Sequence, residues 1–331
     1  MNNADTAFSP LDNRLALSEG GYSPGLQREM VWLSGQLTYE AVSDVLERVG
    51  QCSIPTTSVW QVCQRQGERL VVQAERARNQ VGVERLRWNQ AEYEPQVRKG
   101  VSMDGGMVLV RGEGWKELKV GLVSDLVPPA NRTFDTPDEP VSVKLHYTAV
   151  LGDVADFKPE LWRLAEQYNI PYAGQVAVTA DGAAWIWNLT ADLFPKSTQI
   201  VDWYHATQHL ETAVQTLFPN PDQASAAKSW GHQLKSHLFA GECFKVIEAL
   251  QAKGLVDDAT YFVTHQRRMQ YPAFRAEGFP IGSGATESGV KQFKHRLSGP
   301  GMRWSRPGVN RMAVIRAAVL DRSFDDLWAI A

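Results

Sequence analysis

The chain has 331 residues, of which 44% are hydrophobic and 21% charged, and its formal net charge is −3. This length allows one large domain with one or two smaller ones, and the composition is that of an ordinary globular protein. No apolar run approaches the ~18 residues of a membrane span, and the N-terminus lacks a signal-peptide pattern, which argues against a membrane role and favours the cytoplasm. The three cysteines have neither the spacing of a zinc site nor that of a disulfide framework.

The N-terminal part of the chain is predicted to be helical. Ser23 and Pro24 are typical of a helix N-cap followed by the first helical position. A second helix is predicted over residues 37–49, where apolar residues form one stripe, and a third helix follows. We interpret residues 1–70 as a helix-turn-helix-like DNA-binding region, although generic three-helix packing produces the same pattern. Residues 71–99 are interpreted as a connecting helix because they are rich in Arg, Glu and Gln.

At Val101 the periodicity changes to that of strands. The segments VSMDGGMVLV, ELKVGLVSDLV and VSVKLHYTAVLG predict three consecutive strands, which we expect to be antiparallel. A helix from Pro159, a strand ending at Asp181, another helix and a strand ending at Asp202 follow. The predicted order is therefore β-β-β-α-β-α-β, and we assign residues 100–205 to the first part of the core.

The positions of the acidic residues in this order are informative. Asp104 lies within the first predicted strand, whereas Asp181 and Asp202 end the fourth and fifth strands. The carboxyl ends of strands are where α/β sheets place their sites. Each Asp-Gly pair alone is also ordinary turn chemistry, but the ordered set favours a site. The order, with acids on the first and fourth strands, resembles the ribonuclease H-like fold, in which those two strands are neighbours.

A third carboxylate is expected from a later helix. Residues 206–281 are predicted to be helical, and we interpret them as an all-α insertion before the last catalytic helix. In residues 282–331, Glu287, Lys291 and Lys294 share one helical face at i, i+4 and i+7. The predicted fold class is thus α/β, with a ribonuclease H-like mixed sheet, a helical insertion and an N-terminal helical region.

The C-terminal part carries a basic stretch. No Asp or Glu occurs from Ser288 to Leu320. A solvated helical face would normally mix charges of both signs, so we expect contacts to DNA phosphates here. The predicted DNA-binding residues, including one tryptophan that could stack on a base, are Lys291, Lys294, Arg296, Arg303, Trp304, Arg306 and Arg311.

Several segments together carry a family resemblance: MDGG, TADGAAWIW, FPKSTQIVDWYHATQHL, GSGATES and SGPGMRWSRPGVNRMAVIRAAVLD. The chain resembles the DDE transposases of bacterial insertion sequences, most closely the ISKra-type group, and more distantly Mutator-like and hAT transposases. The resemblance implies that Asp104, Asp181 and Glu287 are the catalytic acids and metal ligands. The Mutator-like signature Asp-x-x-His is matched by Asp202 and His205, which we expect to support the active site.

The resemblance implies a DNA transposase that cuts DNA at the terminal inverted repeats of its element and joins them to target DNA. Two Mg²⁺ or Mn²⁺ ions are the expected cofactors, because three carboxylates suit hard cations better than zinc. A homodimer or larger assembly on DNA, associated with the nucleoid, is also implied. Members of the family often carry a further N-terminal segment, so the start of this chain is short by comparison.

Two alternatives remain open at the level of the sequence. A ribonuclease H-like nuclease would use the same acids without strand transfer. A domesticated or inactive transposase-derived protein would keep the DNA-binding region without catalysis.

Overall fold

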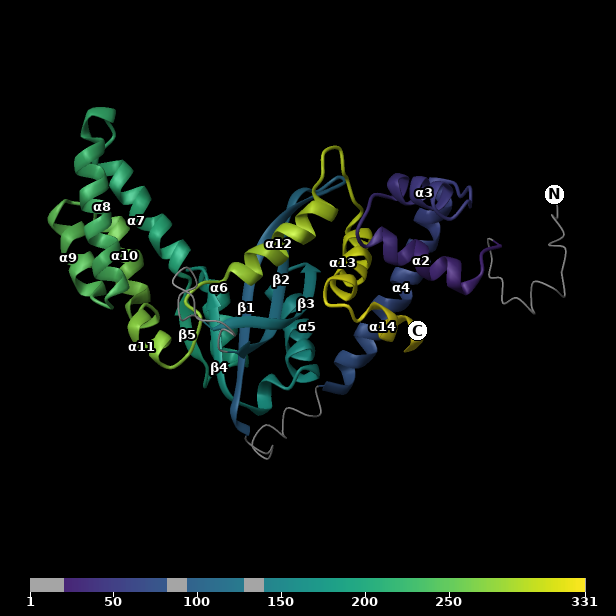
Figure 1. Cartoon of the computed structure of the whole chain (residues 1–331), viewed down its shortest axis with the longest axis horizontal. Coiled ribbons are helices and arrows are strands. Elements are labelled where there is room, and N and C mark those ends of the chain that lie inside the picture. The colour runs from purple at the N-terminus through teal and green to yellow at the C-terminus, as the bar shows by residue number, and fades with distance from the viewer. Residues whose placement is uncertain (1–20, 82–93, 128–139, 331) are drawn as a thin grey trace. The chain divides into compact units, whose positions relative to one another are not determined.

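The computed structural model describes residues 21–81, 94–127 and 140–330. The five strands that it describes are β1 (Glu94–Val110), β2 (Gly114–Val127), β3 (Val141–Leu151), β4 (Ala173–Ala180) and β5 (Thr198–Val201), as Figure 1 shows. The α-helices that it describes are α2 (Pro24–Ser34), α3 (Tyr39–Arg48), α4 (Thr56–Val81), α5 (Val154–Gln167), α6 (Ala184–Leu193), α7 (Trp203–Leu217), α8 (Ala224–Phe239), α9 (Cys243–Ala252), α10 (Val256–His265), α11 (Tyr271–Ala276), α12 (Gly284–Leu297), α13 (Arg306–Leu320) and α14 (Phe324–Ile330).

The strands form one mixed sheet in the order β3-β2-β1-β4-β5. Strands β2 and β3 pair antiparallel, whereas β4 pairs parallel with both β1 and β5. Along the chain, β1, β2 and β3 follow one another directly. Helix α5 then leads to β4, and helix α6 leads to β5, as parallel strands require a crossover connection. This mixed α/β architecture confirms the ribonuclease H-like fold class predicted from the sequence, and it places β1 beside β4.

One face of the sheet packs into the apolar core. Val101 on β1 and Val178 on β4 are paired in register, and both are buried. Phe157 and Leu161 of α5 lie in the same buried cluster, together with side chains of α6. Gly121 on β2 allows a close approach, because a Cβ there would lie only 2.8 Å from Leu161 Cδ1. Because side chains alternate between the two faces of a strand, the branched apolar residues Val101 and Val178 face the helices α5 and α6.

The opposite face carries small and hydroxyl-bearing residues. Gly100 and Ser102 of β1 and Thr179 of β4 line a small cavity together with Thr286, in the first turn of α12. The Ser102 hydroxyl donates to the Thr179 carbonyl, which ties the two strands together. Because side chains alternate, Asp104 follows Gly100 and Ser102 on this face. The acidic residue therefore lies on the side of the sheet that the start of α12 covers.

The ends of several elements differ from the sequence prediction. Helix α5 begins at Val154, earlier than the predicted Pro159, because Asp153 and Asp156 form a capping box; the two acids are therefore structural caps. Helix α4 runs without interruption past residue 70. Strand β1 begins at Glu94, so the last residues of the predicted connecting helix 71–99 are strand, whereas residues 82–93 of that prediction lie outside the described residues.

The chain divides into two compact units. Unit 1 comprises Met1–Gln80, Met107–Lys116 and Gln292–Ala331, whereas unit 2 comprises Val81–Gly106 and Glu117–Lys291. Unit 2 contains every acidic residue that the sequence predicts for the active site. Within the described ranges, none of the helices has both the length and the apolar character that crossing a membrane requires.

We expect Gly121→Ala to destabilise the fold by about 1–3 kcal/mol, because the added methyl group would crowd Leu161 and Phe157 of α5. Urea unfolding of the whole chain measures the loss. Gly284→Ala, which is also in unit 2, is the matched control, since no atom lies within 4 Å of a Cβ at that position. Equal stability of the two variants would contradict the close packing of α5 on β2.

Candidate active site

Two of the predicted catalytic acids come from neighbouring parallel strands. Asp104 lies on β1, and Asp181 directly follows the last residue of β4. The register that pairs Val101 with Val178 brings Asp104 level with Asp181 when it is continued to the end of β4. Asp104 Oδ1 accepts a hydrogen bond from the Gly105 amide at 2.6 Å, and Asp181 Oδ1 accepts one from the Ala183 amide at 2.8 Å. Local backbone amides therefore hold both carboxylates in place.

Asp202 is the N-cap of α7, and its side chain is completely buried. Its Oδ1 accepts from the His205 amide at 2.9 Å, and its Oδ2 accepts from the Ser283 amide. Two backbone hydrogen bonds of 2.8 Å flank it, from the Asp202 amide to the Ala180 carbonyl and from the Trp203 amide to the Ile281 carbonyl. The carboxylate thus joins the end of β5 to the segment that leads into α12.

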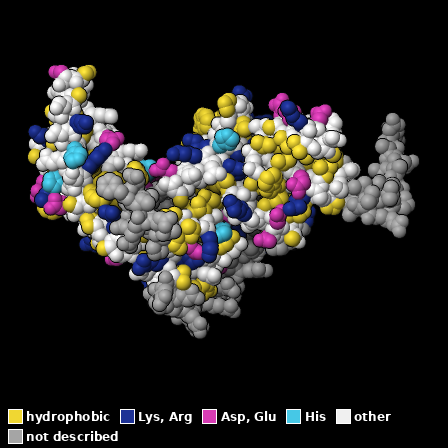
Figure 2. All heavy atoms as spheres, viewed as in Figure 1, with side chains coloured by type: hydrophobic (Ala, Val, Ile, Leu, Met, Phe, Trp, Pro, Cys, Tyr) yellow, Lys and Arg dark blue, Asp and Glu magenta, His cyan; other side chains and the backbone are white. Residues whose placement is uncertain are grey.

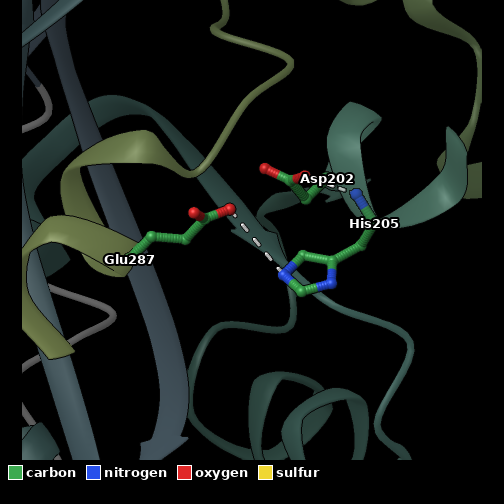
Figure 3. A group of neighbouring side chains, drawn as sticks. All are labelled: Asp202, His205 and Glu287. Atoms are coloured by element: carbon green, nitrogen blue, oxygen red, sulfur yellow. Dashed lines mark hydrogen bonds and ion pairs between the residues drawn. The ribbon is translucent and has the colours of Figure 1, made fainter. Parts of the chain in front are cut away.

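Glu287 lies in the first turn of α12, and its carboxylate points toward His205 (Figure 3). His205 Nε2 lies 3.9 Å from Glu287 Oε1, and the Lys291 ammonium lies 3.5 Å from Glu287 Oε2. One potential ligand atom from each of Asp202, His205 and Glu287 lies within 4.8 Å of the others. These three residues could hold a metal ion between β5, α7 and α12.

The surroundings of Asp104 disfavour its charged form. Burial is the main cause that raises the pKa of the Asp104 carboxyl above its ordinary value, and the negative charges of Asp181 and Glu287 raise it further. The Gly105 amide and the charge of His205 act in the opposite direction. A bound cation would offset the repulsion between a half-buried carboxylate and two anionic neighbours. The set of donors therefore fits a divalent metal ion.

The family resemblance implies that Asp104, Asp181 and Glu287 are metal ligands and that Asp202 and His205 are supporting residues. The structure brings one potential ligand atom from each of Asp202, His205 and Glu287 to within 4.8 Å of the others, and Asp104 interacts electrostatically with Asp181, His205 and Glu287. The roles of the individual residues stay predictions.

One residue near the site carried no sequence signal. Tyr261 of α10 stacks on His209 of α7, with the ring centroids 3.7 Å apart. Its phenol end lies against Gly182, the residue after Asp181. Tyr261 follows Asp181 by some eighty positions in a helix of ordinary composition, so only the tertiary structure identifies it.

The residues predicted to bind DNA have different environments. Lys291 in unit 2 and Lys294 and Arg303 in unit 1 are exposed. In unit 1, Arg306 Nε lies 3.2 Å from a Glu113 carboxylate oxygen. On the face shown in Figure 2, Lys and Arg side chains are interspersed with Asp and Glu instead of forming one basic stripe.

Arg311 is also paired, through its Nε, with Glu68 of α4 at 2.5 Å. Acids from distant segments thus balance part of the basic stretch. This difference from the expectation arises because Glu113 and Glu68 lie far from the stretch in sequence.

Two of the predicted DNA-binding residues are buried in unit 1. Arg296 is 2% exposed, its Nε donates to the Ser34 carbonyl at 2.6 Å, and its guanidinium lies 5.1 Å from the ring centroids of both Tyr39 and Trp304. Trp304 is 9% exposed, and its Nε1 donates to the Leu297 carbonyl at 2.8 Å. Both side chains are used in the packing of unit 1, so neither reaches a phosphate or a base in this conformation.

Comparisons with known proteins add little to this geometry. No family model matches the chain, and no curated protein matches it. Among solved structures, the chain is similar to one described as the Drosophila P element transposase strand transfer complex, with 11% identity and a TM-score of 0.29. That match covers 98% of this chain and 84% of the other. A similarity of this size carries no conclusion about activity.

We expect Asp202→Asn to lower the free energy of unfolding by about 1–3 kcal/mol, because a buried backbone amide would then face the Asn amide group instead of a carboxylate oxygen. Urea unfolding measures this change. Asp257→Asn is the control, since that exposed acid in the first turn of α10 should change stability by less than about 0.5 kcal/mol. Asp202→Asn with wild-type stability would show that the contact to Ser283 is not needed.

We expect Asp104→Asn to raise the melting temperature at neutral pH in the absence of metal. Because the pKa of Asp104 is raised, the folded state binds its proton more tightly than the unfolded state does. Ionisation of Asp104 therefore lowers the free energy of unfolding once the pH exceeds the ordinary carboxyl pKa. The advantage of the variant should therefore vanish below about pH 4, where the carboxyl is protonated in both states. Thermal unfolding in EDTA across this range tests the sign, and a variant that is less stable at neutral pH would contradict it.

Proposed function

We propose that the chain is a DNA transposase that cuts DNA with a carboxylate-bound divalent metal. The observation that carries this proposal is the convergence of Glu287 with Asp202 and His205, beside Asp104 and Asp181, at one edge of a ribonuclease H-like sheet. The finer assignment, to the ISKra-type group of insertion-sequence transposases, rests on the sequence motifs that run through the chain.

The donor set favours Mg²⁺ or Mn²⁺. Carboxylate oxygens are the ligands that these ions prefer, and Asp104, Asp181 and Glu287 would hold two of them. Asp202 and His205 lie close enough to Glu287 to contribute a further ligand. When bound, the metal would activate the attacking water or DNA 3′-hydroxyl and offset the charge that develops on the phosphate.

The other residues of the site would position these groups and the DNA. Asp202 holds the start of α12 through the Ser283 amide, and this contact sets the position of Glu287. Lys291, one turn further along α12, is 76% exposed and lies near the Glu287 carboxylate. Its ammonium would contact a phosphate next to the scissile bond, since a mobile lysine serves as a point charge for phosphate.

Basic side chains outside the site would bind the DNA phosphates. Exposed Lys294 and Arg303 are the remaining candidates for phosphate contacts in the basic stretch, and Arg306 and Arg311 would have to leave their acidic partners first. We propose that the helices α2, α3 and α4 bind the ends of the element. We also propose that the protein acts as a homodimer or larger assembly, because two DNA ends must be joined.

The decisive variant is Glu287→Gln. It should abolish Mg²⁺-dependent cleavage of a duplex carrying the flanking ends of the gene, because it removes a metal ligand, while DNA binding measured in EDTA stays largely intact. Glu248→Gln, at an exposed position of α9, is the matched control and should cleave normally. If Glu287→Gln cuts as fast as the wild type, Glu287 does not belong to the site.

Thermal unfolding supplies a readout that does not depend on cleavage. Mn²⁺ should stabilise the wild type by about 2.7 kcal/mol at a hundred times its dissociation constant, because it binds only the folded state, and should stabilise Glu287→Gln less. The same samples separate the alternatives. Cleavage without joining of the ends to target DNA would favour a nuclease, whereas wild-type protein that binds the ends without cutting would favour a domesticated DNA-binding protein.

A further inference from the structure

Tyr204 is an exposed aromatic residue in the first turn of α7, between two members of the candidate metal site in the sequence. It follows Asp202 and precedes His205, and 59% of its surface is exposed. A Cβ at Gly282 would lie 3.2 Å from Tyr204 Cε2 and 4.0 Å from Asp202 Oδ2. The edge of the ring and the Asp202 carboxylate therefore approach the same glycine, so an accessible ring lies beside the candidate ligands.

Backbone contacts fix the place of this ring relative to α12. The Trp203 amide donates to the Ile281 carbonyl at 2.8 Å, and the residue after Ile281, Gly282, lies against the Tyr204 ring. A side chain at position 282 would crowd the ring, since its Cβ would also lie 3.6 Å from Tyr204 Cδ2. Helix α12 begins shortly afterwards and carries Glu287 in its first turn. The ring is therefore held at the junction between α7 and the helix that supplies Glu287.

The exposed surface of this ring has no aromatic or cationic partner in the described part of the chain. Phe239 differs in this respect, because it packs in a T-shaped arrangement on Trp203 at a centroid distance of 5.3 Å, and the Arg275 guanidinium lies 5.0 Å from its ring centroid. For Tyr204, neither a second ring nor a cation makes such a contact among the described residues. A single exposed ring is ordinary on a protein surface, so what distinguishes Tyr204 is its place beside the carboxylates.

DNA that binds through a phosphate at the candidate metal site would bring the neighbouring nucleotides to the surface around that site. We propose that the Tyr204 ring stacks on the base of a nucleotide next to the phosphate that the site cleaves. The inference rests on the proposed function, to which it adds a residue that positions the substrate.

Stacking suits an exposed aromatic ring because every base has a flat π-face, so the contact needs no particular base sequence. The base would leave the duplex stack, and the ring would offset part of the cost of unstacking it. A ring held at the start of α12 would also fix the phosphate relative to Glu287. Positioning of this kind contributes to catalysis because it reduces the entropy that the bound substrate has still to lose.

The first test compares Tyr204→Ala, which removes the ring, with Tyr204→Phe, which keeps it. On a duplex carrying the flanking ends of the gene, Tyr204→Ala should raise the KM for Mg²⁺-dependent cleavage by about 5- to 150-fold, the range expected for the loss of one stacked base. The kcat should fall less, because stacking holds the bound substrate as well as the transition state. Tyr204→Phe should cleave like the wild type, because its ring can stack equally well.

A modified DNA tests the same contact in the unaltered protein. Abasic residues in place of the bases that flank the cleavage site remove the partner of the ring and leave the phosphates unchanged. The wild type and Tyr204→Phe should show a higher KM for this DNA. Tyr204→Ala should show no further increase, because the contact is already absent. Melting temperatures measured without DNA separate this coupling from a loss of folded protein.

Phe244→Ala is the matched control. The Phe244 side chain is 50% exposed, and it belongs to α9, which packs against α8 and α10. This variant also removes an exposed ring from unit 2. It should nevertheless cleave the intact end like the wild type and show the same increase in KM on the abasic end.

Three outcomes would overturn the inference. An unchanged KM for Tyr204→Ala on the intact end would show that the ring does not bind DNA. An abasic end that weakens Tyr204→Ala as much as the wild type would show that the ring does not stack on those bases. Tyr204→Phe that is as impaired as Tyr204→Ala would assign the contact to the hydroxyl. Wild-type protein that does not cleave intact ends at all would instead refute the proposed function, and the inference with it, so the two failures are distinguishable.

Discussion

The candidate active site depends on the buried carboxylate of Asp202. One oxygen accepts from the His205 amide at the start of α7, and the other accepts from the Ser283 amide that precedes α12. The positions of His205 and Glu287 therefore follow from one side chain. Water cannot replace these bonds at a completely buried position, so loss of the carboxylate would leave an amide without an acceptor. The same carboxylate is a candidate metal ligand, so Asp202 could both hold the local structure and bind the metal.

The two faces of the sheet serve different purposes. Val101 and Val178 pack the apolar face against α5 and α6, whereas Gly100, Ser102 and Thr179 leave the other face small and polar beneath the start of α12. This division places the acids on a rigid strand framework, where carboxylates can be held near one another despite their repulsion. Helix α7 adds His205 to the candidate metal site, and buried residues of α7–α11 belong to the core.

The basic stretch shows that charge counted along a sequence differs from charge on a surface. The stretch has no acid of its own, yet Arg306 pairs with Glu113 and Arg311 with Glu68. Arg296 is buried, and its Nε donates to the carbonyl of Ser34 at the end of α2. The DNA surface proposed for this region would therefore depend on few exposed cations, and its affinity for DNA should decline with salt according to that number.

The sequence by itself determined the features that arise from neighbouring residues. Alternation and helical periodicity located the strands and most helices, Ser23 marked the start of α2, and Asp181 and Asp202 marked the ends of two strands. Only the tertiary structure decided that Asp202 reaches Ser283 and that Tyr261 lies against Gly182. These contacts join segments far apart in the chain. Local propensity cannot specify them, because they follow from strand order and helix packing, which depend on the whole chain at once.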